Sequence, residues 1–184
     1  NPKLSVGKFL VDLFDRTPDV SQSQTRSPLA LRMTPKHFDH FFGQSHLLEQ
    51  GKLLRRAIES DRLGSVIFYG PPGTGKSGLA RLIAAKTKAH FEELNAVTAG
   101  VADIRKAVQT ARLRFQAQSQ KTILLVDEIH HFNRSQQDAL LPDVEKGTVT
   151  LIGITTENPF FYVNAALRSR SQCFEFFSLK PQDL

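Results

Sequence analysis

Apolar residues follow two spacings along this chain, and together these predict alternating strands and helices. Continuous apolar runs at 65–69 and 122–126 are typical of strands that are covered on both faces. Between such runs, apolar residues recur every three to four positions, which indicates amphipathic helices. From residue 29 onward we predict strands at 65–69, 90–94, 122–126, 148–154 and 172–177, and helices at 47–60, 76–88, 102–117, 134–146 and 164–169.

This alternation predicts an α/β domain over residues 29–184. Strands that alternate with helices are joined by right-handed crossovers into a parallel sheet covered on both sides, here a three-layer sandwich with five strands. Residues 1–28 are expected to form a tail. Its part Thr17–Pro28 reads as a flexible linker, while Phe9–Phe14 is either a short docking segment or a cloning boundary. Because the chain begins with Asn, we expect a fragment or a processed product.

Composition narrows the class of protein. With 40% hydrophobic and 23% charged residues in 184, the chain has the values of a soluble globular domain. The longest aliphatic run, Ile123–Val126, is far too short to span a bilayer, so no membrane partner is expected. The lone Cys173 excludes an internal disulfide and is predicted to be a buried strand residue. A net charge of +6 leaves nucleic acid open as a partner.

The segment 70–77 matches the phosphate-binding pattern G-x-x-x-x-G-K-[ST] between a predicted strand and a predicted helix. Its glycines let the backbone turn N–H groups toward phosphate oxygens, and the helix adds the positive end of its dipole. Lys76 supplies a charge for the β- and γ-phosphates, and Ser77 supplies a hydroxyl for Mg²⁺. We therefore predict ATP/ADP binding by Gly70, Pro71, Pro72, Gly73, Thr74, Gly75, Lys76, Ser77 and Gly78.

Two carboxylates follow the buried run 122–126. Ligands of open α/β sheets bind at the carboxyl ends of the strands, where Asp127 and Glu128 are predicted to lie. Asp127 is expected to hold Mg²⁺, directly or through water, and Glu128 to orient and deprotonate the attacking water. The alternative is a solvated acidic pair at a strand end.

Further polar residues are candidates for the same site. A hydroxyl or amide in Thr155–Asn158, after the strand 148–154, can reach the γ-phosphate or its water, or can simply cap the next turn. Arg168 or Arg170 can stabilise transition-state charge in a neighbouring subunit, or can form a surface salt bridge. His130 and His131 are interpreted as polar residues without a metal, because adjacent side chains diverge and no Cys/His partner set exists.

These segments resemble the AAA+ ATPases, especially the clamp-loader and Holliday-junction-motor branch. More narrowly, the chain is similar to the RarA/MgsA family of replication-associated recombination ATPases, kin of the eukaryotic Werner-helicase-interacting protein. The similarity covers about residues 29–184 and is most specific in Phe132–Glu145 and Ile152–Pro159. It implies a Mg²⁺-dependent, DNA-dependent ATPase acting at stalled forks and gaps. Its implied partners are forked, gapped or single-stranded DNA, single-strand-binding protein and further copies of the full-length protein.

The resemblance also implies roles for single residues. Lys76 and Ser77 belong to Walker A, and Asp127 and Glu128 to Walker B. Thr156 resembles sensor 1 and Arg170 the arginine finger, while Gly43 and Gln44 lie near the place where such folds hold adenine. His131 stands where the family usually has Arg, which puts any contact of that Arg in doubt. The helical lid and the oligomerisation region of the family would lie beyond Leu184.

The resemblance implies a location as well: the cytoplasm, at the nucleoid, if the protein is bacterial, and the nucleus or an organelle if it is eukaryotic. Two other functions stay open at this point. One is a clamp-loader-like or branch-migration ATPase. The other is a nucleotide switch or scaffold that binds ATP and scarcely hydrolyses it, although such a switch has no need of Glu128 or Arg170.

Overall fold

The computed structural model describes residue 35 and residues 37–181, which belong to a compact unit spanning Pro35–Leu184. The tail and linker predicted for residues 1–28, and the boundary at residue 29, lie outside the described residues.

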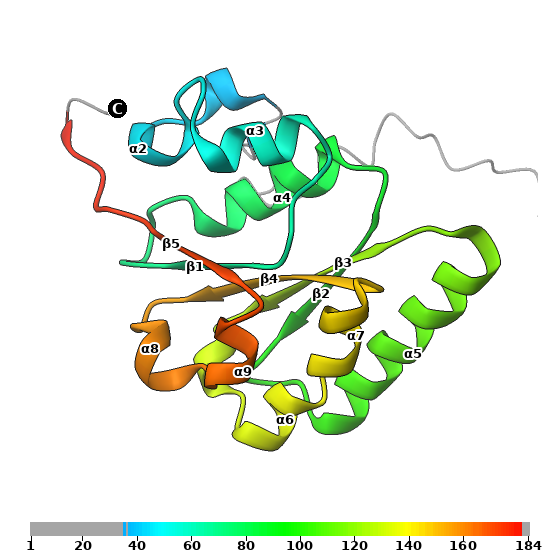
Figure 1. The fold of residues 1–184 in the computed structure, drawn as a ribbon. Helices are drawn as coiled ribbons and strands as arrows, with labels where there is room; N and C mark the ends of the chain where they lie inside the picture. Colours follow the sequence, from blue (N-terminus) through cyan, green and yellow to red (C-terminus); the bar gives the residue numbers. More distant parts are fainter. Residues whose placement is uncertain (1–34, 36, 182–184) are drawn as a thin grey trace, which may run out of the picture. The chain divides into compact units, whose positions relative to one another are not determined.

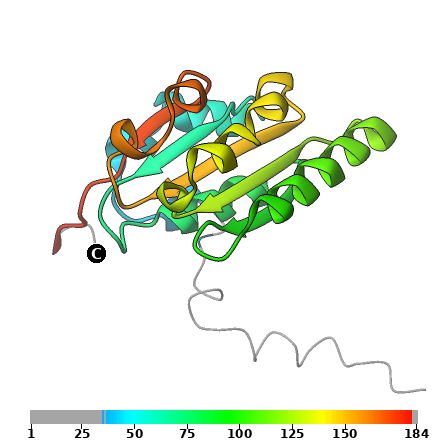
Figure 2. The ribbon, with the colours of Figure 1, turned by 90° about the horizontal axis from the view of Figure 1, so that it is seen from below.

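The core of the fold is a five-stranded parallel sheet with the order β2-β3-β4-β1-β5. Figure 2 shows the arrows of its strands pointing in one direction. The predicted parallel sheet is confirmed, as is the expectation that the strand preceding Thr155 neighbours the strand ending at Asp127. The strands are β1 (Val66–Tyr69), β2 (His90–Asn95), β3 (Thr122–Asp127), β4 (Val149–Thr155) and β5 (Gln172–Glu175).

Helices cover both faces of the sheet and complete the predicted three layers (Figure 1). One layer holds α2 (Ser45–Leu48), α3 (Leu53–Glu59) and α4 (Lys76–Lys86), and the other holds α5 (Val101–Gln118), α6 (Arg134–Asp138), α7 (Leu141–Lys146), α8 (Pro159–Tyr162) and α9 (Ala165–Arg168). Two 3₁₀ turns, η1 (Phe38–His40) and η2 (Ile129–His131), add to these. Among the described residues, no helix combines the length and the apolar character needed to cross a membrane.

Alternation along the strands divides the core in two. In β3, Leu124 and Val126 pack with buried residues of α5, while Ile123 and Leu125 pack with those of α4. Because successive strand side chains point to opposite faces, a strand buried on both sides needs apolar residues at every position. The central place of β3 in the sheet therefore explains why the run 122–126 is continuously apolar.

The prediction of a single helix over 47–60 is wrong, because two helices, α2 and α3, form there. The helical segment α2 ends at Leu48, because Glu49 has φ −60° and ψ 152°, and Gly51, with φ +88°, lies in the turn before α3 begins. The region 134–146 is helical as predicted, and the interruption expected from Pro142 divides it into α6 and α7. Pro142 lies in the first turn of α7, where its missing N–H costs nothing. Helix α8 was not predicted; Asn158 begins it by accepting a hydrogen bond from the backbone N–H of Phe160.

Candidate nucleotide-binding site

The loop between β1 and α4 has the backbone that a phosphate-binding loop requires. Gly70 has φ +135°, and a Cβ there would lie 2.2 Å from the carbonyl oxygen of Phe176. Gly75 has φ +95°, and a Cβ there would lie 2.7 Å from the ring of Phe41. Only glycine fits both positions without movement of the neighbouring chain. The loop leads directly into α4, which begins at Lys76, so the free N–H groups of that helix face the loop.

Lys76 is buried, and its ammonium group is held by oxygen atoms of the loop. Its Nζ donates to the carbonyl oxygens of Gly70 at 2.7 Å and Pro71 at 2.6 Å. Burial lowers the pKa of Lys76, and the charges of Glu128 and Asp127 oppose that shift. Because a charged acceptor makes a stronger bond than a carbonyl oxygen does, a phosphate oxygen can compete for this ammonium.

The acidic pair lies where β3 ends. Burial raises the pKa of Asp127, and the charge of Glu128 raises it further, while the backbone N–H of Glu128 opposes the shift by donating to Asp127 Oδ1 at 3.1 Å. Glu128 itself has φ +53° and ψ +47°. Non-glycine residues rarely adopt this left-handed conformation, and such strain concentrates at functional sites.

The structure brings the predicted loop and the predicted acids together. A hollow of about 400 Å³ is lined by Pro72, Gly73, Thr74, Gly75, Lys76, Ser77, Gly78, Asp127, Glu128, Ile154 and Thr156. A larger hollow of about 840 Å³ includes Leu63, Lys88 and Lys121 and lies at the other end of the strands, away from every predicted site residue. Of these two hollows in the described part of the chain, the smaller is therefore the candidate site, because it combines phosphate-binding and acid–base groups.

The residues of this hollow fit Mg²⁺. Asp127 is a partly buried carboxyl group beside a second acid, and the hydroxyl of Ser77 lines the same space. No group of three His, Cys, Asp or Glu side chains able to hold a metal occurs among the described residues. That number is not required, since Mg²⁺ is usually held by one or two protein oxygens together with waters and substrate phosphates.

Several predicted site residues do not line the hollow, and their roles stay predictions. Gln44 is buried, and its side-chain amide is used by the main chain: Nε2 donates to the carbonyl oxygen of Phe177 at 2.7 Å, and Oε1 accepts from the Phe177 N–H at 3.0 Å. Gln44 therefore ties the segment after β5 to the layer beside the loop. Gly43, Gln44, Gly70, Pro71 and Arg170 are the predicted residues outside the lining.

Arg170 is bonded within its own subunit. Its guanidinium lies 2.6 Å from Glu145 Oε1 and donates to the carbonyl oxygen of Ala166 at 2.8 Å. Arg168, in contrast, lies over the ring of Phe160 at 4.9 Å from its centroid. The ion pair between Arg170 and Glu145 is exposed, and such a pair is weak enough that Arg170 can exchange Glu145 for another partner.

The contacts of His130 and Thr155 were not predicted from the sequence. His130 Nδ1 lies 2.9 Å from Thr155 Oγ1 and 3.3 Å from Glu128 Oε2. Thr156 Oγ1 donates to the same Glu128 oxygen at 3.5 Å. The available signal was the position of His130 two residues after the acid, because a tight turn there returns its side chain toward Glu128.

A phosphate-binding loop at the head of a helix, with an acidic pair on a parallel strand of the same sheet, defines a P-loop nucleotide-binding protein. The family described as "ATPase family associated with various cellular activities (AAA)" matches residues 66–180, well over half of the chain. The chain belongs to this family.

The resemblance to the RarA family is confirmed by several relatives. Replication-associated recombination protein A of Escherichia coli K12 is 51% identical over 160 residues, and that of Coxiella burnetii is 54% identical over 157. The matched regions cover 87% and 85% of this chain but only 36% and 35% of those proteins. ATPase WRNIP1 of Dictyostelium discoideum is 43% identical over 158 residues, 86% of this chain and 18% of that protein. The chain thus spans about a third of the length of the bacterial relatives.

Solved structures show the same fold. The Thermotoga maritima RuvB Holliday junction branch migration motor superposes with a TM-score of 0.66 at 25% identity, over 82% of this chain and 51% of that one.

Proposed function

We propose that this chain is the ATP-hydrolysing domain of a Mg²⁺-dependent ATPase that acts on DNA at stalled forks and gaps, in replication-associated recombination and repair. One observation carries the ATPase part: the phosphate loop and both carboxylates line a single hollow. The DNA part is supported by the names of the bacterial relatives and by the basic net charge of +6.

The residues of the hollow divide the work of hydrolysis. Lys76 and the N–H groups of the loop bind the β- and γ-phosphates of ATP and stabilise the charge that develops there. Ser77 and Asp127 hold Mg²⁺, which supplies positive charge to the phosphates when bound. Glu128 orients the attacking water and accepts its proton, and Thr156 is placed to contact the γ-phosphate or that water.

The remaining parts of the proposal concern assembly and location. In the intact protein, several copies associate, and Arg170 leaves Glu145 to stabilise transition-state charge in a neighbouring subunit. Its proposed DNA partners are forked, gapped or single-stranded. Single-strand-binding protein, which binds the same DNA, is a proposed protein partner. Because the proposed substrate is replicating DNA, we expect the protein in the cytoplasm, at the nucleoid, if it is bacterial, and in the nucleus or an organelle if it is eukaryotic.

A branch-migration motor is the second candidate, because the fold superposes on RuvB. The identity to RuvB is 25%, against 51% to the recombination protein of Escherichia coli, and this difference favours the first candidate. A switch that binds ATP without hydrolysis has no use for a strained carboxylate beside the phosphate loop.

Two variants of the intact protein test this proposal. Lys76→Ala should weaken ATP binding sharply in calorimetry, because the charge that recognises the phosphates is lost. Glu128→Gln should bind ATP normally and hydrolyse it about 10²–10⁴-fold more slowly, because an amide cannot accept the proton. Wild-type turnover by Glu128→Gln, or unchanged affinity in Lys76→Ala, would contradict the site. A hydrolysis rate that forked DNA leaves unchanged would contradict the DNA-dependent part.

A further inference from the structure

We infer that His130 is a positioning residue for Glu128: its Nδ1–H holds one carboxylate oxygen, Oε2, so that the other, Oε1, is free to accept a proton from water. This inference rests on the proposed function, because it concerns the group assigned there as the general base. From the sequence, His130 was interpreted only as a polar residue without a metal. The inference gives it a role in the reaction.

The proton of His130 is located by the atoms around Nδ1. Thr155 Oγ1 lies 2.9 Å away and accepts an N–H from Glu157 at the same distance, and Glu128 Oε2 lies 3.3 Å away. A carboxylate has no proton to give, so an unprotonated Nδ1 would place its lone pair against those of Oε2. The hydroxyl of Thr155 donates to the carbonyl oxygen of Glu157 at 3.4 Å, so Nδ1 carries the hydrogen of the contact with Thr155. This polarised N–H lies beside Glu128 Oε2, 3.3 Å from Nδ1.

Packing fixes the ring that makes this contact. The His130 side chain is 14% exposed, its ring lies 4.2 Å from the ring of His131, and Tyr162 of α8 meets it edge-on at 6.0 Å. Thr155, its hydrogen-bond partner, is fully buried at the end of β4. The donor is thus held by two parts of the fold that are independent of Glu128.

The contacts of Glu128 fall on one side of its carboxylate. Thr156 and His130 both approach Oε2, and no hydrogen bond to Oε1 occurs among the described residues. The Thr156 contact, at 3.5 Å, is too long to fix the carboxylate alone. A general base must lie within hydrogen-bond reach of its water, and a misplacement of about 1 Å can cost about 10²-fold in rate.

Two substitutions of His130 separate hydrogen bonding from packing. His130→Phe keeps an aromatic ring and removes the N–H, while His130→Asn removes the ring and keeps an amide N–H near the position of Nδ1. In the intact protein, His130→Phe should lower kcat for ATP by about 10- to 100-fold with unchanged ATP affinity in calorimetry. His130→Asn should retain kcat within a few-fold of wild type. The opposite order, with Phe active and Asn impaired, would show a packing role and overturn the inference.

A spectroscopic measurement tests the same point without turnover. In nucleotide-free protein labelled with ¹⁵N-histidine, the ring nitrogens of His130 should report a proton on Nδ1. A ring with its only proton on Nε2 would overturn the inference.

The variant Glu128→Gln distinguishes a failure of the proposed function from a failure of the inference about His130. If Glu128→Gln hydrolyses ATP at the wild-type rate, the proposed function fails whatever the His130 variants do. If Glu128→Gln is inactive and His130→Phe turns over normally, the role of His130 fails and the proposed function stands.

Discussion

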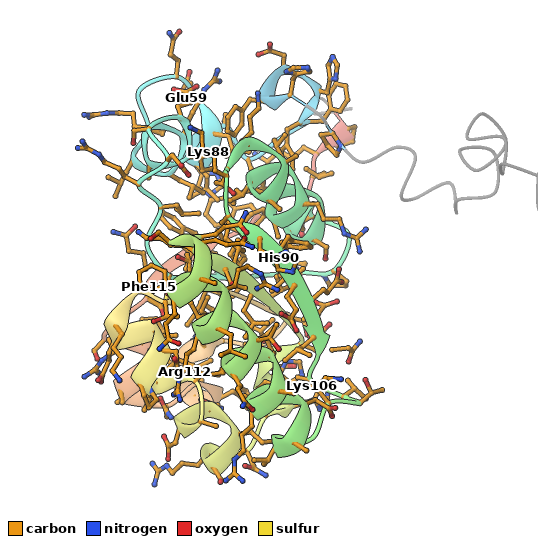
Figure 3. The ribbon with its side chains drawn as sticks, turned by 90° about the vertical axis from the view of Figure 1, so that its right-hand side faces the viewer. Glu59, Lys88, His90, Lys106, Arg112 and Phe115 are labelled. Carbon is orange, nitrogen blue, oxygen red and sulfur yellow. The ribbon has the colours of Figure 1, made fainter. Side chains whose placement is uncertain are left out.

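Replacing Arg112 by alanine should destabilise this domain far more than the loss of an ordinary surface charge, because it leaves a buried carboxylate without its partner. Arg112 lies on α5 (Figure 3) and binds Asp143 of α7 through two hydrogen bonds, from Nε to Oδ1 at 2.6 Å and from a terminal nitrogen to Oδ2 at 2.8 Å. The Asp143 side chain is 0% exposed, and that of Arg112 is 50% exposed. The hydrogen bonds with Asp143 raise the pKa of Arg112.

The magnitude follows from these exposures. Breaking a buried ion pair by removing one partner costs about 3–5 kcal/mol, whereas an exposed pair is worth about 0–1 kcal/mol. Arg112 is half exposed, so water can reach the carboxylate once the arginine is truncated. We therefore expect Arg112→Ala to lower the free energy of unfolding by about 2–4 kcal/mol, between these limits but nearer the first.

Urea denaturation of the nucleotide-free protein measures this cost. With a denaturant slope of about 2 kcal/mol per molar urea, the midpoint should fall by about 1–2 M. Arg81→Ala is the matched control, because Arg81 pairs with Glu93 and both side chains are partly exposed, at 32% and 39%; its cost should stay below about 1 kcal/mol. The double variant Arg112→Leu/Asp143→Leu should lose less than Arg112→Ala, since no charge stays buried. Equal midpoints for Arg112→Ala and Arg81→Ala would refute this reasoning.

Two further variants change Asp127, which lines the hollow, and Arg170, which does not. The raised pKa of Asp127 means that the fold disfavours its ionised form, a penalty that is present above its folded-state pKa and disappears at acid pH, where the carboxyl group is protonated in both the folded and the unfolded states. Asp127→Asn should therefore raise the thermal midpoint of nucleotide-free protein at neutral pH and not at acid pH; an equal shift at both would contradict the assignment. Arg170→Ala should leave folding nearly intact, because its pair with Glu145 is exposed, and should lower kcat by about 10³-fold in the intact protein. Mixing it with Lys76→Ala should restore part of the activity, while Arg168→Ala should stay active; normal turnover by Arg170→Ala would identify it as a surface arginine.

The sequence by itself determined the features that depend on neighbouring residues. Strand and helix periods are local properties, so the runs 65–69 and 122–126 predicted β1 and β3 within a residue of their ends. The loop 70–77 could also be predicted from the sequence, because the backbone angles and close approaches at its glycines require glycine there. Local reasoning failed over 47–60, where the apolar spacing continues across Gly51 although the backbone does not.

Only the tertiary structure decided which distant residues meet. The strand order puts β4 between β1 and β3, and this places Thr155 and Thr156 beside the turn that follows Glu128. Gln44 is bonded to the backbone of Phe177, 133 residues away, and Arg170 to Glu145 on another helix. No periodicity encodes such pairs, because each depends on strand order, on register and on the angle at which a helix leaves the sheet. The sequence therefore named the acid Glu128, and the fold supplied His130, the residue that we infer holds it in place.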